Sequence, residues 1–134
     1  MPYGQVNTDT IQSSTTGTAP VFKDGSGNQI GVLARAWVMF TMSGTTITVQ
    51  KSFNVASVSL YATGKYIISF SNNMSDATYA VIGSSSINTA GSSYETFQMN
   101  VAGGQATSAF NCGTVGFSSG TFDNATSVHI SVFD

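Results

Sequence analysis

Apolar and small polar residues alternate along most of this chain with a period of two. The alternation is clearest in one run, where one face would carry Ala34, Ala36, Val38 and Phe40 and the other Arg35, Trp37 and Met39. Such runs, interrupted by clusters of Gly, Asn and Ser, are typical of short strands with one face in a core. They predict core strands at residues 33–41, 45–53, 55–60, 65–71, 78–84, 94–101, 108–112 and 126–133.

No segment repeats apolar residues at the spacing of a helix over three turns, so we expect almost no helix. Short strands separated by turn residues about every ten positions indicate an all-β fold. We predict an antiparallel β-sandwich, either jelly-roll-like or immunoglobulin-like. Ser43-Gly44 is the signature of a tight hairpin turn, and residues 72–77 form a longer hairpin loop.

Residues 1–20 are predicted to form an extended N-terminal arm, followed by a single sandwich domain at residues 21–134. The arm contains Val6 and Ile11 among polar residues, and Pro20 closes it in extended geometry. An arm with so few apolar side chains is ordered only by lying on its own domain or on a neighbouring subunit. We therefore expect Val6 and Ile11 to be contacts with a neighbouring subunit or a larger assembly.

Trp37 and Met39 share the second face of their strand, which is too apolar for an ordinary solvent face. One interpretation is a contact with another subunit. The other is that a second sheet of the same monomer covers this face.

Composition narrows the class of protein further. The 134 residues suit one domain, and only ten of them are charged, four basic and six acidic, giving a net charge of −2. A surface of this kind does not attract phosphates, which argues against nucleic-acid binding.

Cys112 is the only cysteine and is expected to be a buried apolar side chain. No apolar run is long enough for membrane insertion, and Met1–Gln5 lacks the features of a secretory signal, so we expect the chain to be made in a cytoplasm.

Three patterns imitate functional motifs. Residues 116–120 fit GxSxG around Ser118, with Asp123 and His129 following, but no helix is expected after the serine and the three lie too close in the chain for a hydrolase triad. His129 has no partners for a zinc site. Asp24 begins a calcium-like loop that lacks its final carboxylate, so a turn is the better interpretation. We predict no catalytic, metal or cofactor site; a carbohydrate-active enzyme is the disfavoured alternative from another class, because no acid pair is visible.

Several spaced blocks, in order, resemble a module of bacteriophage virion proteins, especially tail-fibre and related structural proteins of cyanophages and other aquatic phages. The matching residues are Ala34, Arg35, Ala36, Trp37, Val38, Phe40, Ser52, Phe53, Asn54, Val55, Ser57, Gly64, Tyr66, Phe70, Met74, Asp76, Ala77, Tyr79 and Gly83. Residues 6–12 and 23–31 look like the leader of the same family, so the resemblance covers about the first two thirds of the chain.

The resemblance implies a non-enzymatic virion protein, a tail-fibre or fibre-tip component that assembles as a homotrimer. The arm would dock on other virion proteins, and loops would meet a host surface. Saccharide binding there is plausible because hydroxyl, amide and tyrosine side chains supply hydrogen bonds and stacking. The receptor-facing candidates are Tyr61, Tyr79 and Tyr94, although strand packing is the favoured role for each of them. A capsid decoration or cement protein that stabilises the phage head is the alternative function.

Overall fold

The computed structural model describes residues 10–11, 20–86, 95–99, 103–117 and 119–134, and it divides the chain into two compact units. The units are Met1–Leu33 and Ala34–Asp134, so the division falls after Leu33, whereas the sequence suggested a division after Pro20. Each unit is described by itself.

The first unit contains a small antiparallel hairpin of β1 (Phe22–Lys23) and β2 (Gln29–Gly31). Its turn is organised by Asp24, whose Oδ1 accepts hydrogen bonds from the backbone N–H groups of Ser26 and Asn28, both at 2.9 Å. The side chain of Asn28 donates to the other carboxylate oxygen, and these bonds lower the pKa of Asp24. The carboxylate is therefore used within the turn, as predicted for this loop.

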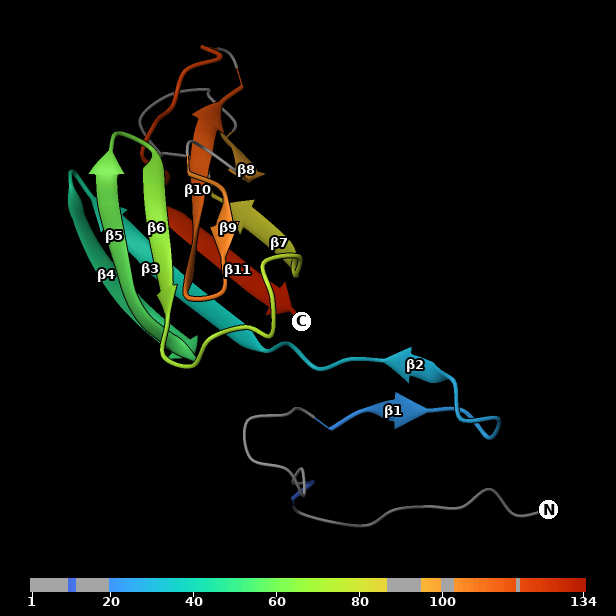
Figure 1. The fold of residues 1–134 in the computed structure, drawn as a ribbon. Helices are drawn as coiled ribbons and strands as arrows, with labels where there is room; N and C mark the ends of the chain where they lie inside the picture. Colours follow the sequence, from blue (N-terminus) through green and yellow to red (C-terminus); the bar gives the residue numbers. More distant parts are fainter. Residues whose placement is uncertain (1–9, 12–19, 87–94, 100–102, 118) are drawn as a thin grey trace. The chain divides into compact units, whose positions relative to one another are not determined.

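The second unit is an all-β sandwich, which confirms the predicted fold class (Figure 1). One sheet has the order β4-β3-β11-β7, and the other has the order β5-β6-β10-β8 with β9 beside β10. All pairings are antiparallel. The strands are β3 (Ala36–Ser43), β4 (Thr46–Phe53), β5 (Val55–Ala62), β6 (Lys65–Phe70), β7 (Ala80–Ser85), β8 (Glu95–Met99), β9 (Gln105–Ala106), β10 (Ala109–Gly116) and β11 (Ser127–Phe133).

Each of the eight predicted core strands has a counterpart in this list. The largest difference at a strand end is in β10, which continues to Gly116 and not to the predicted end at Cys112. Strands β2 and β9 were not predicted, because two or three residues are too few to show alternation. Residues 94, 100 and 101 of the predicted sixth strand lie outside the described residues.

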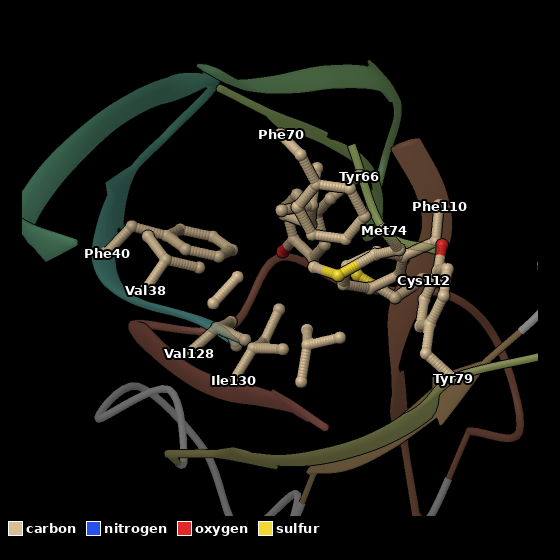
Figure 2. Packing of buried hydrophobic residues seen from close by; sticks show 14 residues of the cluster. Val38, Phe40, Tyr66, Phe70, Met74, Tyr79, Phe110, Cys112, Val128 and Ile130 are labelled. Carbon is tan, nitrogen blue, oxygen red and sulfur yellow. The ribbon is translucent and has the colours of Figure 1, made fainter. Parts of the chain in front are cut away.

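The core lies between the two sheets and is built by alternate residues of four central strands (Figure 2). Phe40 of β3 and Tyr66 of β6 meet edge to face, with ring centroids 5.2 Å apart. The hydroxyl of Tyr66 lies 3.3 Å from Oγ1 of Thr114, so its polar atom is paired inside the core. Cys112 is fully buried, as predicted, and burial raises the pKa of its thiol to about 12.

One asparagine holds the tips of two hairpins, one from each sheet. Oδ1 of Asn124 accepts a hydrogen bond from the N–H of Gly64, at the β5–β6 turn, at 2.6 Å. Its Nδ2 donates to the carbonyl of Gly44, at the β3–β4 turn, at 3.0 Å. Both glycines have positive φ, +64° and +60°, which the tight turns require. Asn124 thus fixes the two sheets to each other at this end of the sandwich.

Candidate functional site on the outer face of the four-stranded sheet

Trp37 and Met39 lie on the side of sheet β4-β3-β11-β7 that faces away from the core. Their neighbours Ala36, Val38 and Phe40 are buried, whereas Trp37 keeps 38% of its surface exposed. Within the sandwich unit, the second sheet packs on the opposite side of this sheet and does not cover this face. Contact with another subunit stays a prediction.

The residues that point the same way as Trp37 form what we call the outer sheet face. Because side chains alternate along each strand, the pairing of the strands sets these residues in rows across the sheet. The first row, read from β4 to β7, is Phe53, Trp37, Ser131 and Ile82. The second row is Lys51, Met39, His129 and Ser84.

The two rows border a shallow hollow of about 340 Å³. Its lining includes Trp37, Lys51, Ile82 and His129, which come from all four strands. This volume is at the small end of the range of about 300–1,000 Å³ for small-molecule sites. The hollow combines an aromatic surface with groups that can donate hydrogen bonds.

The outer sheet face differs in charge from the chain as a whole. The four strands contain Lys51 and His129 but no Asp or Glu; outside the strands, Arg35 comes directly before β3 and Asp134 directly after β11. The whole chain has six acidic residues against four basic ones. The basic groups are therefore left without an acidic neighbour in any of these strands.

Two local features position the strands behind this face. The β3–β4 register shifts between Met39 and Phe40, and Gln50 is the extra residue in β4; its Nε2 donates to Oγ1 of Thr41 at 3.1 Å. On the inner side of β7, a Cβ at Gly83 would come within 2.5 Å of the Phe97 ring. A glycine here therefore lets the phenylalanine of the second sheet pack directly against the β7 backbone.

The predicted receptor-facing tyrosines differ in their exposure to solvent. Tyr79 is 5% exposed, and its hydroxyl donates to the carbonyls of Ala106 and Ala109, at 2.9 and 3.1 Å. The receptor-facing prediction is wrong for Tyr79, because its ring fills the core and its hydroxyl fastens the β9–β10 turn. Tyr61 is 41% exposed on β5, so receptor contact stays a prediction for this residue. Tyr94 lies outside the described residues.

The predicted arm contacts are only partly described. Ile11 is 61% exposed, whereas Val6 lies outside the described residues.

Several residues that carry the family resemblance have structural roles at corners and loops of the sandwich. Asn54 has a positive φ of 54° at the corner where β4 leads into β5, which belongs to the other sheet. Its side chain donates to the carbonyls of Arg35 and Asn72 and accepts the N–H of Asn72 at 2.7 Å. Met74 is buried, and Asp76 accepts hydrogen bonds from Thr78, which lower the pKa of its carboxyl. These positions define corners and loops.

The patterns that imitated catalytic motifs are not assembled by the described residues. Ser118 lies outside them, His129 belongs to the outer sheet face, and the N–H of Asp123 bonds to the Thr114 carbonyl at 3.1 Å beside the β5–β6 turn. No cluster of three or more His, Cys, Asp or Glu suited to a metal ion occurs in the described part of the chain. A search of the same residues finds no helix with the length and hydropathy to cross a membrane.

Sequence reasoning missed most of the hollow's lining, above all Lys51, Ile82 and Ser84. Each of these residues pairs with an outward-facing residue of β3 or β11, so strand pairing is the signal that would have identified them. That register is not readable from one strand at a time.

In comparisons with known proteins, no family model, no curated protein and no solved structure matches the chain.

Proposed function

We propose that this chain is a non-enzymatic structural protein of a bacteriophage virion. It serves as a tail-fibre or fibre-tip component, assembles as a homotrimer and contacts the host surface. The sequence blocks described above support the family, and the all-β sandwich is an architecture suited to it. One structural observation carries the assembly part of the proposal.

That observation is the hairpin β1–β2 and the residues beside it. Large apolar side chains that the hairpin does not bury are Val21, Phe22, Ile30, Val32 and Leu33, each at least 40% exposed. A two-stranded hairpin has no core of its own and is at best marginally stable in water. Exposed apolar side chains gathered in so short a segment are typical of a surface that a partner covers.

In the proposed assembly, this hairpin and the preceding residues pack against a neighbouring subunit or a larger virion protein. The sandwich then remains a rigid body that presents its sheet faces and loops to the outside. The role needs no chemical step, only stable packing and a surface of defined shape.

The assembly is tested by size-exclusion chromatography with light scattering on the purified chain. We expect a multiple of 13.9 kDa, three for the trimer. The double substitution Phe22→Ser/Ile30→Ser should reduce the number of subunits in the oligomer. Deletion of residues 1–20, tested separately, should do the same. Phe117→Ser is the matched control, because Phe117 is 75% exposed on the sandwich unit. A stable wild-type monomer, or equal effects of the hairpin and control substitutions, would contradict the proposal.

A capsid decoration protein is the second candidate, since the same exposed hairpin would serve to dock the chain on a phage head. Locating the chain in particles separates the two roles.

A further inference from the structure

We infer that the outer sheet face binds an acidic saccharide, meaning a chain of sugar rings that carry carboxylates. The inference deepens the proposed function by naming the class of host-surface partner. Its test uses the isolated protein and so does not depend on where the chain sits in a particle.

The outer sheet face offers an aromatic surface. Trp37 is the only tryptophan of the chain and lies exposed on the second strand of the sheet, with Phe53 beside it on β4 and Ser131 on β11. An indole offers a broad, rigid apolar surface at a small cost in conformational entropy. The C–H face of a sugar ring is apolar and flat enough to stack on such a surface.

Hydrogen-bonding groups lie beside this aromatic surface. The second row lies one strand repeat from Trp37, about 7 Å along the sheet. In this row Lys51 and His129 flank Met39, and Ser84 follows on β7. The ammonium, imidazole and hydroxyl groups match the carboxylate and hydroxyls of a sugar acid. Ser131, which also lines the hollow, offers a further hydroxyl for hydrogen bonds to the sugar.

The charge of the outer sheet face distinguishes between its possible binding partners. A second copy of this chain that buried its own outer sheet face against this one would bury Lys51, and none of the four strands supplies an acidic partner. Burying an unpaired charge is costly. An anionic partner supplies the missing countercharge, so the face is suited to an acidic ligand and not to itself.

The test is isothermal titration of the purified protein with hexagalacturonate at low and high salt. Maltohexaose is the neutral saccharide control, and poly-glutamate is the control for a polyanion without sugar rings. We expect binding of hexagalacturonate alone, weakened at high salt because the lysine is solvent-accessible.

Variants assign the site. Trp37→Ala should weaken binding about tenfold or more, the loss expected for one stacking side chain, and Trp37→Phe should restore part of it. Lys51→Gln should weaken binding and reduce the salt dependence. Lys23→Gln is the matched control, because it makes the same change in net charge on the hairpin unit. Circular dichroism of each variant verifies that the sandwich is intact.

Four results would overturn the inference: no binding of hexagalacturonate, equal binding of poly-glutamate or maltohexaose, equal effects of the two lysine substitutions, or full affinity in Trp37→Ala. A further result would reassign the face to subunit contact. That result is a loss of oligomer mass in Trp37→Ala by light scattering.

Discussion

Gly64 is the position where a single added methyl group should do most damage to the sandwich. A Cβ there would lie 2.5 Å from both N and O of Asp123 and 2.8 Å from O of Thr114. All three are backbone atoms, which cannot rotate away as a side chain would. Gly44 is a matched control, because it occupies the other hairpin tip with nearly the same φ, and a Cβ added there would have no atom within 4 Å.

The two substitutions to alanine therefore separate two costs. Both variants carry the cost of a non-glycine residue in the left-handed region, about 1–2 kcal/mol. Gly64→Ala adds the cost of overpacking, typically about 1–3 kcal/mol. We expect Gly44→Ala to lower the free energy of unfolding by about 1 kcal/mol and Gly64→Ala by about 2–5 kcal/mol.

Urea unfolding followed by the fluorescence of Trp37 measures both losses, with far-ultraviolet circular dichroism as a second probe. The m-values should stay unchanged, so that the midpoints report stability alone. Equal losses for the two variants would refute the close packing of the β5–β6 turn against the segment around Asp123.

Three further predictions concern buried polar and ionisable groups. Tyr79→Phe removes the hydrogen bonds to the carbonyls of Ala106 and Ala109, so it should lower the free energy of unfolding by about 1–2 kcal/mol; an unchanged urea midpoint would contradict this. Cys112 should not react with a thiol reagent in the native protein, because its thiol is buried with a pKa of about 12, and should react fully in urea; fast native reaction would contradict its burial. The carboxylate oxygens of Glu95 are buried with no partner among the described residues, and burial raises the pKa of the group above 4.5. The folded state then holds the proton more tightly than the unfolded chain, so stability falls as the pH rises from 4.5 through the folded pKa. Glu95→Gln should abolish this fall and stabilise the protein at pH 7 but not at pH 4; equal effects at both pH values in urea titrations would contradict it.

The sequence predicted the strands well because their signal is local. Alternation within eight residues, as in β3 and β11, shows both the strand and its buried face. The turn at Gly44 was equally readable from its residue types. The fold class follows from such signals added along the chain.

The candidate site could not be predicted in the same way, because it depends on which strands become neighbours. Trp37 was identified as unusual, but Ile82 joins it only through β11, which is distant in sequence from both β3 and β7. Lys51 joins it through the β3–β4 hairpin, whose register depends on a bulge that the sequence did not show. Asn124 is a second example: it appears in the sequence as an ordinary loop residue, yet it bonds to Gly64 and Gly44, 60 and 80 positions away. For Tyr79 the favoured packing role agrees with its burial, and only its listing as a receptor-facing candidate fails, because residue type alone does not show whether a tyrosine is buried.

The most direct test of the central claim is to locate the chain in phage particles whose genome encodes it. Purified particles would be examined by peptide mass spectrometry and by electron microscopy with gold-labelled antibody against the purified chain. We expect peptides of the chain in the particles and gold at the tail fibres. Gold on the heads would contradict the tail-fibre role in favour of capsid decoration. A chain that is abundant in the lysate but absent from the particles would contradict the proposal that it is a virion protein.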